Sequence, residues 1–157
     1  MALTTFVAGQ VLTALQLNDS FDAMVQKAQV SGAVVNTNQT TTSSTYTDLA
    51  TVGPEVTTTT GTSVLIMITA DLGDPANTAG LIRASFAVSG ATTRAASDNE
   101  ALIFAGAVVG GTDPITTGSR AVVITGLTAG SNTFTMKYKT SAGTASFANR
   151  NIVVIPL

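Results

Sequence analysis

The chain has 157 residues, of which seven are Lys or Arg and nine are Asp or Glu, so its formal charge is −2 and only 10% of it is charged. It contains no His, Cys or Trp, which excludes zinc sites of the His/Cys type, thiol and Ser-His catalysis and disulfide bonds. Seven scattered basic residues are too few for a phosphate-binding surface, so we expect no nucleic-acid partner. The length fits one domain, alone or with a short appendage, and we expect a structural protein that is not an enzyme and holds no cofactor.

The first thirty residues differ in pattern from the rest of the chain. The stretch Phe6–Leu12 is interpreted as an extended apolar arm, which has no place in the strand pattern that follows and is expected to dock on another protein. Thr13 and Gln16 match a capping box, in which the hydroxyl and the amide satisfy free backbone N–H groups at the start of a helix. A helix is therefore predicted from Thr13 to about Gln29.

Within that helix, apolar residues recur at spacings of three and four, which places them at positions a and d of a heptad. They are Ala14, Leu17, Phe21, Met24 and Ala28. The stripe needs a partner, because an isolated helix of this length is marginal in water. Two partners remain open, namely the β domain of the same chain and the same helix in other copies. Together with Phe6 and Leu12, these residues form the predicted attachment and oligomerisation site.

After residue 30 the helical period disappears, and residues 31–157 are predicted to form one β domain. Thr occurs 28 times, and β-branched side chains with few charges suit pleated, half-buried strands. Residues 36–45 are a polar tract without an apolar face, either a solvated linker or an outer edge strand. Turn residues separate the predicted strands. These strands are Tyr46–Val52, Glu55–Thr60, Ser63–Ala70, Leu81–Ser89, Asn99–Ala107, Arg120–Thr125, Thr133–Thr140 and Ser146–Ile155.

The alternation of residue types indicates which faces of these strands are buried. Phe134, Met136 and Tyr138 alternate with polar residues, which places one side of this strand in the core and the other in water. Val64–Ile68 is apolar at every position and is predicted to be buried on both faces, with its outer face at an interface. The fold prediction is mainly β, a jelly-roll-like antiparallel β-sandwich preceded by one short N-terminal α-helix.

Few charged residues are candidates for chemistry. Asp71, Asp74, Asp98 and Asp113 lie beside turn residues, so a Ca²⁺ site is weighed against a role in turns, and the turn role is expected. Arg150, in a strand that is otherwise apolar, is interpreted as either a solvent-facing side chain or an ion-pair anchor at a subunit contact, with the second favoured. No apolar run exceeds five residues, whereas about 20 are needed to cross a bilayer, so no membrane insertion is expected.

Two stretches carry a family resemblance. The opening, Phe6 to Phe21, in which an aromatic, a small residue and a glycine lead into a Leu- and Asn-rich helix, resembles the N-terminal segment of tailed-bacteriophage fibre and accessory virion proteins. Thr47-Asp48-Leu49 before a Gly-Pro turn, and Gly126–Met136, are similar to the trimeric jelly-roll heads of such proteins. The resemblance implies a homotrimer on the virion surface, fixed through its N-terminal region to the major capsid protein or another virion protein, with the jelly roll directed outward.

Such a protein can occupy several places on a particle. A length of 157 residues leaves no room for the shaft that projects a receptor-binding tip, so we predict a homotrimeric capsid decoration protein of the cement or head-fibre kind. The alternative is a tail-fibre or receptor-binding tip protein that adsorbs to host-surface glycans. That role would require exposed aromatic residues in loops, whereas the Phe and Tyr residues here fall mostly at predicted strand positions.

Overall fold

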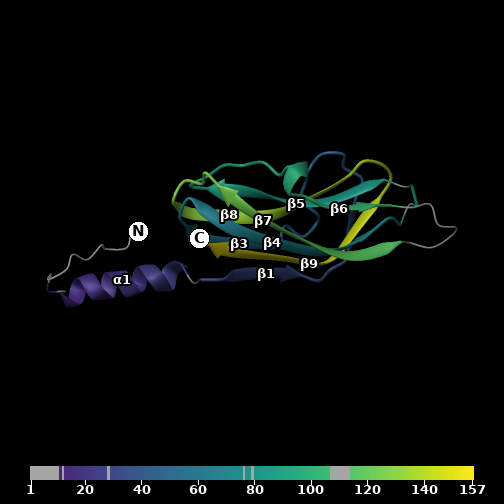
Figure 1. The fold of residues 1–157 in the computed structure, drawn as a ribbon. Coiled ribbons are helices and arrows are strands. Elements are labelled where there is room, and N and C mark those ends of the chain that lie inside the picture. The colour runs from purple at the N-terminus through teal and green to yellow at the C-terminus, as the bar shows by residue number, and fades with distance from the viewer. Residues whose placement is uncertain (1–10, 12, 28, 76, 79, 107–113) are drawn as a thin grey trace.

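The computed structural model describes residues 11, 13–27, 29–75, 77–78, 80–106 and 114–157, and gives only the backbone for residues 23–27. In this part of the chain one α-helix precedes an antiparallel β region that includes one short 3-10 helix (Figure 1). The elements in chain order are α1 (Ala14–Lys27), β1 (Ser31–Val35), β2 (Gln39–Thr41), β3 (Glu55–Thr60), β4 (Ser63–Gly73), β5 (Leu81–Gly90), the 3-10 helix η1 (Asp98–Glu100), β6 (Leu102–Ala105), β7 (Ile115–Thr125), β8 (Gly130–Thr140) and β9 (Ala145–Pro156).

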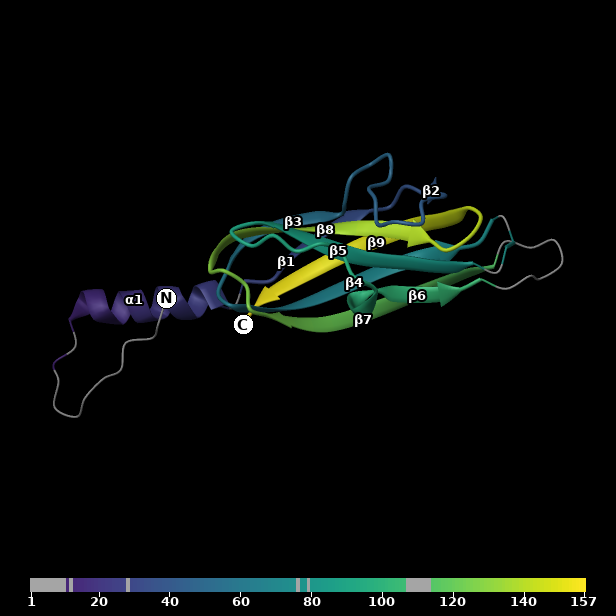
Figure 2. The ribbon, with the colours of Figure 1, turned by 90° about the horizontal axis from the view of Figure 1, so that it is seen from above.

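The described strands form two sheets that pack face to face (Figure 2). One sheet is five-stranded, with the order β1-β9-β4-β7 and with β2 also paired to β9, and the other is four-stranded, with the order β3-β8-β5-β6. All pairings are antiparallel.

The strand order defines the topology. If β1 and β2 count as one interrupted first strand, the pairs are first with eighth, second with seventh, third with sixth and fourth with fifth. This is the order of one long hairpin wrapped around itself, which is the jelly roll. The predicted fold class, a mainly β jelly-roll sandwich with one short helix before it, is confirmed.

The core lies between the two sheets and is built from the inward residues of each strand. Phe134, Met136 and Tyr138 of β8 are fully buried, as their alternation predicts. Tyr138 and Phe147 of β9 pack ring against ring with centroids 4.8 Å apart. The other large side chains that are almost completely buried are Val64, Ile66, Ile68, Leu72, Ile82, Phe86, Arg150 and Ile152. One cluster of aliphatic and aromatic side chains thus joins both sheets, which explains how the sandwich stands without a disulfide.

Several strand predictions differ from the structure. The predicted strand Asn99–Ala107 begins in the 3-10 helix η1, and the described strand covers only Leu102–Ala105. Tyr46–Val52 is not a strand: only Thr47 bridges to β8, where its backbone N–H and C=O both bond to Tyr138 at 3.0 Å. Pro54, which has no backbone N–H, separates this bridge from β3, so the pairing with β8 cannot run on without a break. Conversely, the five residues of β1 were not predicted, and part of the polar tract does form an edge strand, β2.

The helix α1 lies beyond one end of the sandwich. In Figures 1 and 2 it extends away from β1, and the C-terminus lies at that same end. The register explains this placement, because Ser31 at the start of β1 pairs with Val154 near the end of β9. One end of the molecule therefore brings together α1, the start of β4 and the ends of β7 and β9.

Candidate functional site

The start of α1 is fixed by the predicted capping box. The Thr13 backbone N–H donates to Gln16 Oε1 at 3.1 Å, and the Gln16 backbone N–H donates to Thr13 Oγ1 at 3.2 Å. Each side chain thus satisfies one backbone donor that the first turn of a helix leaves free. The helix ends at Lys27, two residues before the predicted end.

The described residues of the predicted attachment site are exposed on this helix. Ala14 is exposed, and Leu17 and Phe21 are 42% and 55% exposed. Phe6, Leu12 and Ala28, and the side chain of Met24, lie outside the described residues. The heptad pattern did not include Val11 and Leu15, which are 88% and 70% exposed. Apolar side chains are therefore presented to solvent along the described part of α1.

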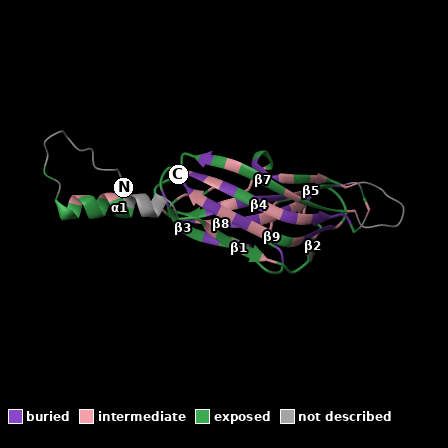
Figure 3. Ribbon diagram, turned by 60° about the horizontal axis from the view of Figure 1, so that its bottom comes forward, coloured by how far each residue is buried: buried purple, intermediate pink, exposed green. Residues whose placement is uncertain are grey.

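A second exposed apolar surface lies on the outer face of the five-stranded sheet. The cross-strand register aligns its outward side chains in rows that run from β7 across β4 to β9. The two rows nearest α1, which we name the apolar half, contain Val123, Leu65 and Ile155, and then Ala121, Met67 and Val153. The next two rows, which we name the polar half, contain Ser119, Thr69 and Asn151, and then Thr117 and Asp71. Figure 3 faces this sheet and shows exposed residues on its outer strands, β1 and β7.

The apolar half includes the outer face of the strand segment that was predicted to be buried on both sides. In Val64–Ile68 only the inward residues are buried, because Leu65 is of intermediate exposure and Met67 is 42% exposed on the outer face. Within a single chain this strand is therefore not buried on both faces.

The polar half is organised around Asp71. Its carboxylate accepts hydrogen bonds from Asn149 Nδ2 at 2.6 Å and from Thr117 Oγ1 at 2.5 Å. Asp71 lies in β4, not in a loop as predicted. Opposite it β9 carries a bulge, and Asn149 has the positive φ of 46° that such a bulge accommodates. The residues around this carboxylate are neutral hydroxyl and amide donors.

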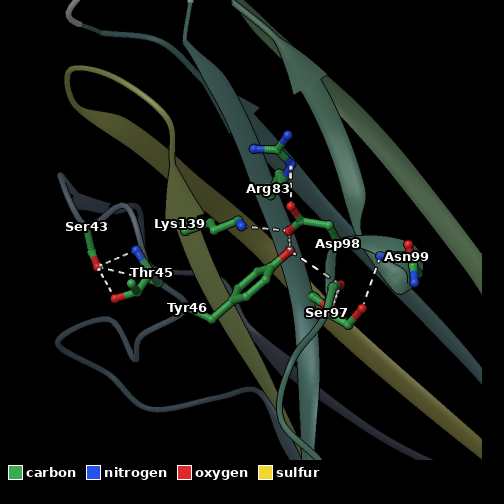
Figure 4. Close-up of polar contacts among 9 residues, drawn as sticks. Ser43, Thr45, Tyr46, Arg83, Ser97, Asp98, Asn99 and Lys139 are labelled. Atoms are coloured by element: carbon green, nitrogen blue, oxygen red, sulfur yellow. Dashed lines mark hydrogen bonds and ion pairs between the residues drawn. The ribbon is translucent and has the colours of Figure 1, made fainter.

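A charged cluster on the outer face of the four-stranded sheet centres on Asp98 (Figure 4). Its carboxylate accepts hydrogen bonds from Lys139 Nζ at 2.7 Å and Tyr46 Oη at 2.9 Å, and Arg83 Nε lies 3.7 Å away. Lys139 also lies over the Tyr46 ring, 4.6 Å from its centroid. The hydrogen bond from Lys139, and then that from Tyr46, lowers the pKa of Asp98, while burial and the Asp98 carboxylate raise the pKa of Tyr46. The cluster fastens η1 and the loop before β3 to β5 and β8.

Arg150 is neither solvent-facing nor an ion-pair anchor, so both interpretations of it are wrong. It is completely buried, and none of the ion pairs among the described residues involves it. Nη1 donates to the Gly53 carbonyl at 3.1 Å and Nη2 to Gln39 Oε1 at 3.1 Å, with longer contacts to the carbonyls of Thr37 and Thr51. The guanidinium also stacks 5.3 Å from the Tyr138 ring centroid. Arg150 therefore holds the excursion between β1 and β3 against the end of the core.

Among the described residues, no group of three or more His, Cys, Asp or Glu side chains is placed to hold a metal ion. No helix in the described part of the chain is long and apolar enough to span a bilayer.

Comparison with known proteins gives likenesses to solved structures, with fourteen matching chains. No protein-family model matches the chain, and no curated protein matches it. A solved structure described as "Structure of infectious bursal disease virus Gx strain" is similar over 82% of this chain and 32% of that chain, with a TM-score of 0.44 and 14% sequence identity. This chain thus spans about a third of the length of the chain it resembles, and a likeness at this level carries no inference about function.

Proposed function

We propose that this chain is a structural protein of a bacteriophage virion, a homotrimeric capsid decoration protein of the cement or head-fibre kind, bound to the particle surface through its N-terminal region. In this role the protein performs no catalysis and requires no cofactor. Its partners are two further copies of itself and the major capsid protein or another virion protein.

The observation that carries the proposal is the exposure of apolar side chains on a helix that lies outside its own sandwich. Leu15, Leu17 and Phe21 of α1 are exposed by 42% to 70%, although α1 has only 14 residues. A helix this short is marginal in water unless an apolar face is covered. Because Ala14, Leu17 and Phe21 follow the a and d spacing of a coiled coil, the same helix of neighbouring copies suits this face.

The sandwich supports the same role. The jelly roll is a topology that recurs in viral capsid and lectin domains, which favours a binding or assembly function. Among the described residues, Phe21 of α1 is the one aromatic side chain in the exposed class, so the described sandwich shows no aromatic platform for stacking sugar rings. This favours particle decoration over a glycan-binding tip. The family resemblance of the opening stretch adds the attachment to a phage particle.

The proposal is tested by mass and by location. Light scattering of the purified chain at tens of micromolar should give three times the mass of one chain, and a monomer at that concentration contradicts the proposal. Gold-labelled antibody against the chain, applied to particles of the phage that encodes it, should mark the head. Label on the tail would instead support the tail-fibre alternative, and particles without label would contradict a virion role.

A further inference from the structure

Attachment through α1 does not use the apolar half of the five-stranded sheet. Within one chain this half remains accessible to solvent. Elsewhere on the described part of the sandwich, exposed large apolar residues lie in smaller groups, such as Leu81 and Ile103 near the edge of the other sheet. The apolar half differs because six outward apolar residues adjoin in two cross-strand rows. Ala121, Met67 and Val123 are exposed, the last two by 42% and 54%, and the other three are of intermediate exposure. A contiguous apolar surface of this kind is typical of an interaction site.

The charge distribution indicates which partner suits this surface. The first three rows of the face, from Val123 to Asn151, contain no charged side chain, whereas Asp48, Asp98, Lys137 and Lys139 lie on or over the opposite sheet. Side chains near a rotation axis meet their own copies, so any charge there would face a like charge. A neutral apolar surface avoids this repulsion and is suited to packing against further copies of the same chain.

Two features next to the apolar half add area to a contact between copies. Val30, which directly precedes β1 on the side of α1, is 63% exposed and adds a further apolar side chain near this end of the sheet. On the other side β7 is an edge strand of 11 residues that, among the described strands, pairs with β4 alone. It contains no Lys or Pro, residues that commonly protect a free edge, and its one charged residue, Arg120, donates to the Asn99 carbonyl at 3.3 Å.

We propose that the apolar half is the contact between copies within the homotrimer. In this arrangement the three sandwiches pack their apolar halves around the three-fold axis, and the α1 helices lie along the same axis. This inference rests on the proposed homotrimer and adds the surface through which the sandwiches meet. The occupant is a second copy of this chain.

The test compares lysine substitutions on the two halves of the same face in the full chain. Met67→Lys and Val123→Lys place a charge in the apolar half, and Thr69→Lys and Ser119→Lys place the same charge in the next row, two residues from Met67 in β4 and four residues from Val123 in β7. All four side chains point outward, so each variant should keep β-type circular dichroism. The first pair should raise the apparent dissociation constant of the trimer at least tenfold, and the second pair should leave it within about twofold.

A second measurement does not depend on a disruptive substitution. Because the chain has no Cys, Val123→Cys and Ser119→Cys each introduce a single thiol whose alkylation rate reports its exposure. In the assembled protein the thiol at position 123 should react at least tenfold more slowly than on dilution to monomer, and the thiol at position 119 should react at similar rates in both.

The outcomes separate this inference from the proposed function. A trimeric wild type that tolerates Met67→Lys and Val123→Lys, with a freely reactive thiol at position 123, overturns the inference and leaves the homotrimer standing. Equal dissociation by all four lysine variants also overturns it, because the apolar half then has no special role. A monomeric wild type overturns both.

Discussion

The helix and the sandwich are stabilised in opposite ways. In the sandwich, side chains distant in sequence bury one another, and Phe147 and Tyr138 make contact within a core that involves both sheets. In α1 the resolved stabilising contacts are local, namely the reciprocal bonds of Thr13 and Gln16, while Leu15 and Phe21 remain exposed. The difference teaches that the core of the sandwich is complete within one chain, whereas the described apolar side chains of α1 are left uncovered by it.

The largest expected effect comes from truncating an aromatic residue in each region. Phe147→Ala removes a completely buried ring and should lower the free energy of unfolding by about 3–5 kcal/mol at every protein concentration. Phe21→Ala removes a side chain that is 55% exposed in the single chain, so it should weaken only the stability that depends on association. Urea unfolding at two protein concentrations measures both.

The contrast between the helix and the sandwich is wrong if Phe147→Ala and Phe21→Ala depend on protein concentration in the same way. A loss for Phe21→Ala that persists after dilution to monomer would mean that α1 packs on its own sandwich, which is the other partner left open by the helix pattern.

A smaller effect is expected from the cap of α1. Thr13→Ala removes the hydroxyl that accepts the Gln16 N–H, and loss of such a cap costs helices about 1 kcal/mol. Hydrogen exchange should therefore accelerate in the first turns of α1, while exchange in the core strands β4 and β8 stays unchanged. Thr13→Ser keeps the hydroxyl and serves as the control. Faster exchange in β4 would show that the helix and the sandwich unfold together.

The smallest effect concerns the surface of the sandwich. The pKa of Asp98 is lowered in the folded chain, so this carboxylate contributes stability above its unfolded pKa of about 4, and that contribution is lost as the pH falls through the lower folded value. Because the side chain is 48% exposed, Asp98→Asn should cost at most about 1 kcal/mol at pH 7. The difference from wild type should disappear near pH 2.

Thermal melts across pH 2–7 measure this difference. A gap between Asp98→Asn and wild type that stays constant at low pH would mean that the Asp98 cluster acts through packing and not through charge.

Local patterns in the sequence predicted the fold well. The period-two alternation in β8 and the capping box at Thr13 depend on neighbouring residues, so both could be found without knowledge of the tertiary structure. The number and spacing of strands then suggested the jelly roll. The strand β1 was missed because its five residues are short, partly exposed and contain Gly32, so its pairing with β9 has no strong local pattern.

Long-range contacts account for what the sequence could not predict. Tyr46 and Asp98 meet although 52 positions separate them, and Arg150 reaches Gln39 across 111 positions. Arg150 is two residues before the buried Ile152, so the alternation along the strand places its side chain on the inner face. The sequence did not indicate the distant carbonyl oxygens that accept hydrogen bonds from its guanidinium. For the attachment site, the spacing indicated Leu17 and Phe21, and exposed Leu15 lies outside the heptad pattern.

The two ends of the sandwich differ, because one end carries α1 and the other end carries the β8–β9 turn. Leu157 lies at the end that carries α1, whereas the β8–β9 turn, residues 141–144, lies at the opposite end with Ser141 and Ala142 exposed. A reporter fused after Leu157 would crowd the proposed contacts between copies. A short peptide inserted in the β8–β9 turn would point away from them, so this turn is the place from which a foreign epitope could be displayed at high density on a particle.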